Sequence, residues 1–230
     1  MAATDPLGPA AAGPSSEPRD RVETGGSEAP ATQDAAALVT SVAPYRSAEE
    51  QLRAAGLEML GSCQHLSTWP DLMQRSELLQ DFSPAEADIL GQAMLLVRAQ
   101  PGQLLIAEDE ASDWMMLLLR GTVDVGKRRI GGEADGADSS GEKHAGNTRL
   151  AVLREGAALG EMSMLDGEPR YASVWALSEV ECGILSRVAV SRLISAHPAV
   201  GAKLLVKLTQ LLAQRLRNIS TQLVKMLQRT

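Results

Sequence analysis

Two charged residues of opposite sign, Glu161 and Arg170, lie nine positions apart in the stretch LGEMSMLDGEPRYASV (Leu159–Val174). An ionised carboxylate only accepts hydrogen bonds, so it favours a ligand with hydroxyl groups, such as a ribose. A guanidinium presents a planar fork of donors that matches a phosphate. An acid for a sugar and an arginine for a phosphate in one short stretch predict a small-nucleotide site. From the spacing alone, a structural ion pair between the two residues is the simpler interpretation.

The residues beside the acid favour an anion as well. Gly160 permits a close backbone approach and an unusual φ angle. The following MSMLDG predicts a single helical turn, whose free N–H groups can face an anion.

Short segments of strand character surround this stretch. Pro101-Gly102 separates MLLVRA from QLLIAE, and Gly121 interrupts DWMMLLLRGTVDVGK, where it predicts a bend or bulge. TRLAVLREG, YASVWAL and EVECGILS follow along the chain. Strands at this spacing predict a small antiparallel roll or barrel. The polar, glycine-rich Gly126–Asn147 predicts a long loop, interpreted as a solvated insertion.

Helices are predicted on both sides of these strands. Ser47 and Glu50 form a capping-box pattern that begins a helix reaching about Leu60. TWPDLMQRSELLQDF predicts another short helical stretch, and Ser83, Pro84 and Glu86 begin a further helix.

A long helix is predicted from about Pro198 to Leu227, with one apolar stripe. The stripe comprises Leu205, Leu208, Leu212, Leu216, Ile219, Leu223 and Met226. At about 1.5 Å per residue such a helix runs about 45 Å, too long to be buried on a small roll. Part of it is therefore expected to pair with a second copy.

Composition narrows the class of protein. Residues 1–46 are rich in Ala, Pro, Gly, Ser and Glu, which predicts a disordered tail, with a partner-binding segment as the alternative. The net charge of −7 argues against a whole-surface field for nucleic acid. Two distant cysteines and three scattered histidines indicate no metal site, no disulfide framework and no acid–base catalysis. The absence of a signal peptide or membrane span in the sequence favours a cytoplasmic protein.

The stretch GEMSMLDGEPRYASV resembles the phosphate-binding cassette of cyclic-nucleotide-binding domains. LLIAEDEASDWMMLLLRGTVDV is similar to the second to fourth strands of that family, and SRVAVSRLISAHPAV to its connector into the last helix. The resemblance spans about residues 78–226 and implies an α+β fold, a jelly-roll β-roll flanked by N-terminal helices and a long C-terminal helix. We expect a tail at 1–46, a helical segment at 47–75, the roll at 76–197 and the long helix at 198–230.

The resemblance also implies a binding site. Glu161 would bind the ribose 2′-hydroxyl and Arg170 the cyclic phosphate, with backbone amides of Gly160, Met162 and Ala172 around them. The candidate ligand-binding residues are Gly160, Glu161, Met162, Ser163, Arg170, Tyr171, Ala172 and Ser220.

Two departures from the family pattern concern the base. Tyr171 stands where a small residue is more common, so its ring must leave the pocket or stack over the base. In bacterial cyclic-AMP receptor (Crp/Fnr-type) regulators two hydroxyl residues contact adenine, where this chain has Ile219 and Ser220. This difference argues against high-affinity binding of cyclic AMP and leaves cyclic GMP or another nucleotide open.

The expected function is a non-enzymatic cyclic-nucleotide receptor that needs no cofactor, forms a homodimer through the C-terminal helix and acts on an unknown downstream protein. The alternatives are a ligand-independent interaction module on the same fold, or a DNA-associated regulator. DNA is not expected, because the sequence after the long helix leaves no room for a recognition helix. The basic residues of that helix, which has no acid, are expected to flank a dimer seam or face an acidic partner or body; they are Lys203, Lys207, Arg215, Arg217, Lys225 and Arg229.

Overall fold

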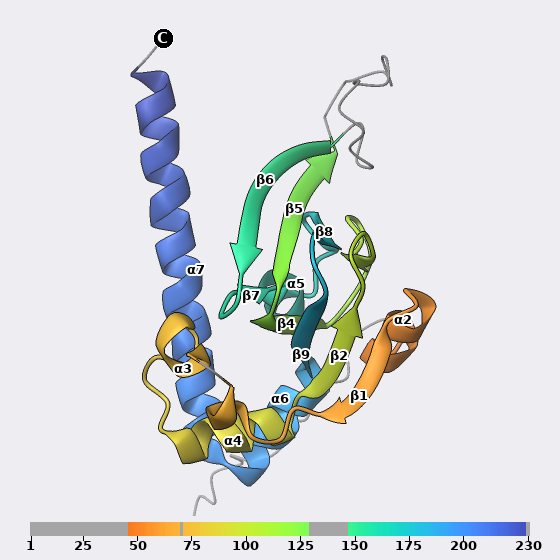
Figure 1. Cartoon of the computed structure of the whole chain (residues 1–230). Helices are drawn as coiled ribbons and strands as arrows, with labels where there is room; N and C mark the ends of the chain where they lie inside the picture. Colours follow the sequence, from red (N-terminus) through yellow and green to blue (C-terminus); the bar gives the residue numbers. More distant parts are fainter. Residues whose placement is uncertain (1–45, 70, 129–146, 229–230) are drawn as a thin grey trace, which may run out of the picture. The chain divides into compact units, whose positions relative to one another are not determined.

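The computed structural model describes residues 46–69, 71–128 and 147–228 (Figure 1). They fall within one compact unit, Ser41–Thr230. The predicted N-terminal tail therefore lies outside the described residues, as does most of the predicted loop, residues 129–146.

The described strands form two sheets, and every strand pair is antiparallel. The first sheet has the order β1 (Glu58–Ser62), β2 (Leu95–Ala99), β9 (Val180–Ser186), β4 (Trp114–Arg120), β7 (Ala158–Leu159). The second has the order β3 (Leu104–Ile106), β8 (Ser173–Ala176), β5 (Thr122–Arg128), β6 (Asn147–Arg154). This arrangement confirms the predicted α+β roll.

The chain passes from one sheet to the other at the predicted breaks. Pro101-Gly102 lies between β2 and β3, and Gly121 lies between β4 and β5, so each break joins strands of different sheets. The predicted loop was too long at both ends. Gly126 pairs with Arg149 and Ser173, and Arg128 pairs with Asn147, so the ends of the glycine-rich stretch belong to β5 and β6.

The helices of the described chain lie before, within and after the roll. They are α2 (Ala48–Ala54), the 3-10 helix η1 (Leu66–Thr68), α3 (Leu72–Arg75), α4 (Pro84–Gln92), α5 (Glu161–Asp166), α6 (Arg187–Ala196) and α7 (Pro198–Leu227). Both predicted capping boxes, at Ser47 and Ser83, are present. The predicted extension of the first helix to Leu60 is wrong, because Gly56 adopts a φ of 72° after Ala54 and the chain continues into β1.

β4 carries the core on both of its faces. Trp114, Met116 and Leu118 point between the two sheets. Met115, Leu117 and Leu119 point to the other side, where the helices pack. Because both faces are covered, the strand is a continuous apolar run rather than an alternating one. β4 thereby joins the roll to the helical layer that ends in α7.

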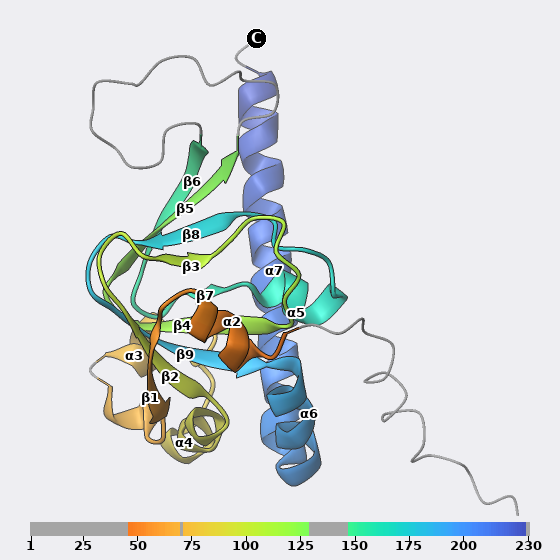
Figure 2. The same ribbon diagram turned by 90° about the vertical axis from the view of Figure 1, so that its right-hand side faces the viewer.

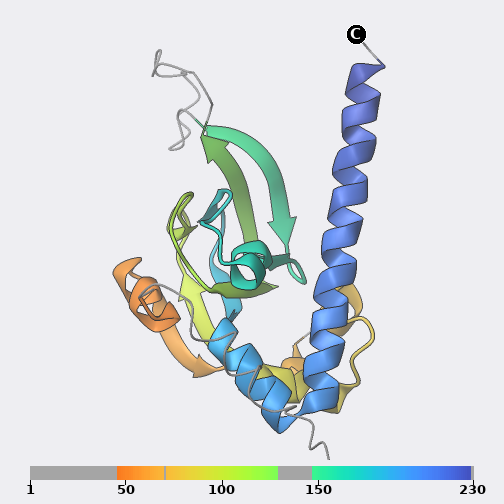
Figure 3. The ribbon, with the colours of Figure 1, turned by 180° about the vertical axis from the view of Figure 1, so that it is seen from behind.

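The buried apolar residues of α7 lie in its first half, which packs against the rest of the described chain (Figures 1 and 3). Its buried apolar residues are Val200, Leu204, Leu208 and Leu211. The predicted stripe is therefore wrong at its start, since Leu205 is exposed and Leu212 is only half-buried. The sequence pattern included Leu208 but missed the neighbouring leucines that face the body. The second half of the helix exposes Leu216, Ile219, Leu223, Val224, Met226 and Leu227.

Candidate functional site

The start of α5 is built around Gly160 and Arg170. Gly160 caps α5 with a φ of 72°, as its residue type predicts. The Nη1 group of Arg170 donates a hydrogen bond to the Gly160 carbonyl oxygen at 2.8 Å. A Cβ atom at position 160 would lie 2.4 Å from this Nη1, so a side chain there would displace the guanidinium. Gly160 is thus needed both for the positive-φ turn and for the space that the Arg170 guanidinium occupies.

Arg170 is buried without a carboxylate partner among the residues that the structure describes. Only 2% of the residue is exposed, and its guanidinium lies 4.3 Å from the centroid of the Trp114 ring. Two of its nitrogens, Nε and Nη2, are buried without a hydrogen-bond partner among the described residues. Burial lowers the pKa of Arg170 to about 10, although Glu110, Asp113 and Glu161 act in the opposite direction. The side chain stays charged at neutral pH, with two donors left for an anion.

Glu161, 2% exposed, pairs with the long helix rather than with Arg170. The Nη1 group of Arg215 in α7 donates to its Oε1 atom, and Nη2 of Arg215 donates to the Ala158 carbonyl oxygen at 2.6 Å. The alternative that Glu161 and Arg170 form a structural ion pair is therefore wrong. Sequence reasoning counted Arg215 among the cations of the helix but did not place it at the site. Figures 2 and 3 show α5 on the side of the roll that faces α7.

The other candidate residues lie in different environments. Ser163 is buried, whereas Met162 is 48% exposed and Tyr171 is 60% exposed. Ala172 is half-buried and follows Tyr171 directly. Ser220 lies on the exposed part of α7, where its hydroxyl donates to the Leu216 carbonyl at 2.9 Å. The structure thus brings residues 160–163 and 170–172 together, and the role of Ser220 stays a prediction.

Cations of α7 also bind acids near the N-terminal helices. Lys203 donates to both carboxylate oxygens of Glu86 at 2.7 Å. Lys207, buried at 9% exposure, pairs with Asp81. The expectation that the basic residues of this helix face an acidic body is confirmed for Lys203, Lys207 and Arg215, while Arg229 lies outside the described residues.

The described part of the chain holds no cluster of His, Cys, Asp and Glu able to bind a metal ion. Burial raises the pKa of the Cys63 and Cys182 thiols to about 12, which disfavours their reactive thiolate form. No helix in the described ranges is long and apolar enough to span a membrane.

Comparisons with known proteins agree with this geometry. Residues 96–197 match the family model described as a cyclic nucleotide-binding domain. A crystal structure of a cyclic nucleotide-binding domain from Methylobacillus flagellatus is 30% identical, with a TM-score of 0.60. That likeness covers 74% of this chain and 89% of the other.

Two curated relatives are regulators. A CRP-like cAMP-activated global transcriptional regulator of Mycobacterium tuberculosis is 24% identical over 157 residues, which cover 68% of this chain and 62% of the relative. A cAMP-dependent protein kinase regulatory subunit of Yarrowia lipolytica is 25% identical over 134 residues, covering 58% of this chain and 32% of the relative. The chain thus spans less than two thirds of either relative. With this β-roll, this cassette and these matches, the chain belongs to the cyclic-nucleotide-binding domain family.

Proposed function

We propose that the chain is a regulatory domain that binds a cyclic nucleotide, cyclic AMP or cyclic GMP, at residues 160–163 and 170–172. Arg170 binds the cyclic phosphate together with backbone amides of Gly160, Met162 and Ala172. Glu161 accepts a hydrogen bond from the ribose 2′-hydroxyl. The base extends toward α7, where Ile219 and Ser220 lie farther along the helix.

The observation that carries this proposal is the environment of Arg170. An unpaired charge in a protein interior is costly, and most buried polar groups therefore have partners. Within the described ranges, two buried donors of Arg170 have no hydrogen-bond partner, and they lie beside the positive-φ turn at Gly160. A phosphate would satisfy both donors and neutralise the charge. Binding of a phosphate therefore offsets the free-energy cost of burying the Arg170 charge.

The link from ligand to output runs through Glu161. Arg215 uses Oε1 of this carboxylate, so a ribose hydroxyl that binds Glu161 acts on the group that also holds α7. A ligand shifts an equilibrium only through different affinities for its two states. We infer that the nucleotide favours one position of α7 relative to α5.

The exposed end of α7 is a surface through which this movement can act on a partner protein. Contiguous apolar surface on a helix marks an interaction site. We propose that the residues from Leu216 to Leu227 pair with the same segment of a second copy, which forms a homodimer. The same surface would serve the alternative function, a ligand-independent interaction module.

Isothermal titration of the full chain with cyclic AMP, cyclic GMP and adenosine tests the proposal. Adenosine keeps the base and ribose but lacks the phosphate, so it is the matched control ligand. At least one cyclic nucleotide should bind, and adenosine should bind far more weakly. If neither cyclic nucleotide binds, the receptor function is wrong, and the interaction module is the better account.

A further inference from the structure

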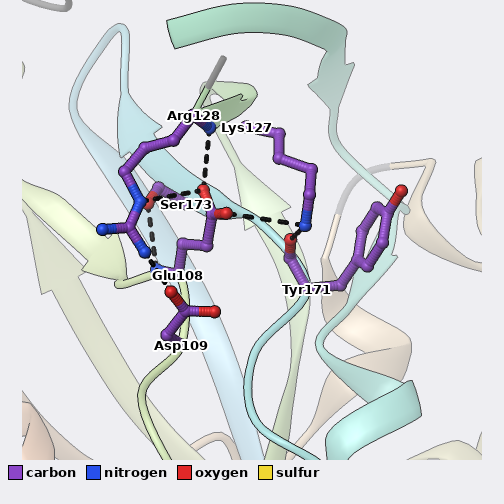
Figure 4. A network of polar contacts seen from close by, with 6 residues as sticks. All are labelled: Glu108, Asp109, Lys127, Arg128, Tyr171 and Ser173. Carbon is purple, nitrogen blue, oxygen red and sulfur yellow. Dashed lines mark hydrogen bonds and ion pairs between the residues drawn. The ribbon is translucent and has the colours of Figure 1, made fainter. Parts of the chain in front are cut away.

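The peptide that follows Arg170 is held by a lysine from another strand. Nζ of Lys127, at the end of β5, donates a hydrogen bond to the Tyr171 carbonyl oxygen at 2.7 Å. The same ammonium lies 3.8 Å from the centroid of the Tyr171 ring. Figure 4 shows the Lys127 side chain reaching the backbone and lying beside the ring. The Tyr171 ring therefore packs against the Lys127 ammonium and does not cover the Tyr171 backbone.

A buried carboxylate fixes Lys127 in turn. Its Nζ lies 3.5 Å from Oε1 of Glu108, whose side chain is only 8% exposed. The Arg128 backbone amide donates to Oε2 of Glu108 at 2.9 Å, and the Glu108 amide donates to the Ser173 hydroxyl at 3.0 Å. Burial acts to raise the pKa of Glu108, but the Arg128 amide and the Lys127 charge outweigh it and hold this pKa below its ordinary value. These contacts form a network that joins Glu108, the end of β5 and residues 171–173 (Figure 4).

This network of contacts determines the direction of one backbone N–H group in the cassette, that of Ala172. A trans peptide is planar, so the carbonyl of one residue and the N–H of the next point in opposite directions. Because Lys127 holds the Tyr171 carbonyl, it also orients the Ala172 N–H. The peptide before it is held in the same manner, since the Asp109 amide donates to the Arg170 carbonyl at 2.9 Å. The contact with the Arg170 carbonyl comes from a backbone amide, which a substitution does not remove. The contact with the Tyr171 carbonyl comes from the Lys127 side chain, so a substitution can test it.

We propose that Lys127 is a positioning residue for phosphate binding, which orients the Ala172 N–H toward the anion. The inference rests on the proposed function, because it needs a phosphate in the cassette. A donor preorganised in the binding direction loses no conformational freedom on binding, which strengthens affinity. In this proposal Lys127 acts on the phosphate only through the Tyr171–Ala172 peptide, so its effect depends on the contact with the Tyr171 carbonyl.

The test compares three variants of the full chain by isothermal titration with cyclic AMP and cyclic GMP. Lys127→Met keeps the methylene groups and removes the donor, and it should weaken binding of the nucleotide that the wild type binds by roughly tenfold, the loss of about one hydrogen bond to a charged group. Lys127→Arg restores a cationic donor and should recover most of the affinity. Arg154→Met is the matched control. It removes the same charge from an exposed residue at the other end of the β5–β6 pair, where Arg154 lies opposite Thr122, and it should bind like the wild type.

A second readout separates positioning from a general effect on folding. In ¹H–¹⁵N NMR spectra the Ala172 amide should shift downfield when the nucleotide is added to the wild type, and the shift should be much smaller in Lys127→Met. Equal affinity in Lys127→Met and the wild type would overturn the role of Lys127 and leave the proposed function intact. An equal loss of affinity in Arg154→Met would show that long-range charge, and not positioning by Lys127, explains the effect. Absence of binding by the wild type would overturn both proposals.

Discussion

The Arg215 guanidinium of α7 donates to the Glu161 carboxylate at the start of α5, so one part-buried contact joins the long helix to the cassette. The second Arg215 contact, to the Ala158 carbonyl, fixes the guanidinium against the strand that precedes the cassette. The cassette and α7 therefore cannot change position independently while this contact persists.

Replacing Arg215 with methionine tests this coupling. The change leaves a buried carboxylate without its cation, which should destabilise the fold by about 1 to 3 kcal/mol, toward the lower end because Arg215 is partly exposed. Nucleotide affinity should fall as well, because Glu161 loses the group that orients it. Thermal unfolding and isothermal titration measure the two effects. Arg217→Met is the matched control, since Arg217 is an exposed cation of the same helix that bonds to Gln214. Equal behaviour of the two variants would show that the Glu161–Arg215 contact carries no coupling.

Aspartates at Ile219 and Leu223 should separate the proposed dimer. Both side chains are more than half exposed, at 63% and 55%, so the change should spare the folded chain. In a symmetric helix pair, however, it places like charges together in an apolar seam. Light scattering should report a dimer for the wild type and a monomer for the double variant. Gln214→Asp adds a charge on the opposite face of α7 and should remain dimeric. A wild-type monomer at tens of micromolar, or a dimeric double variant, would exclude α7 as the seam.

The ion pair between Glu86 and Lys203 predicts a dependence of stability on pH. The hydrogen bond from Lys203, with a second from the Ser83 amide, lowers the pKa of Glu86 from 4.5 to about 2. A lowered folded-state pKa stabilises the fold above the unfolded value, so this contribution is complete above pH 4.5 and is lost as the pH falls toward 2. The melting temperature of Glu86→Gln should therefore lie below that of the wild type at neutral pH, and the difference should shrink in acid. A difference between Glu86→Gln and the wild type that is independent of pH would contradict the prediction.

The roll and the cassette were predictable from the sequence because their signals are local. Gly121 and Pro101-Gly102 mark changes of strand direction, and the capping boxes at Ser47 and Ser83 mark helix starts. The site was predicted from the resemblance of the whole stretch GEMSMLDGEPRYASV to a family cassette, because the spacing of Glu161 and Arg170 alone favours an ion pair. The sequence around Glu161 did not reveal that its carboxylate pairs with Arg215 of α7.

The parts that were missed depend on contacts between distant segments. Arg215 is one of several cations on α7, and only the packing of that helix places it on Glu161, 54 residues away. Leu204 and Leu211 were missed because an apolar periodicity defines a broad face, and tertiary packing selects the part of it that is buried. Lys127 stands 44 residues from Tyr171, and the pairing of β5 with β8 brings them together.

The affinity of Arg170→Met for cyclic AMP and cyclic GMP, measured together with its melting temperature, tests the central claim most directly. Methionine fills similar space but removes a buried charge, two of whose donors have no partner in the described part of the chain. Without ligand, the variant should therefore be at least as stable as the wild type. Nucleotide binding should weaken by about 2 kcal/mol or more, because a charge-assisted contact to the phosphate is lost. Unchanged affinity, or a large fall in melting temperature without ligand, would contradict the account and make Arg170 a structural residue.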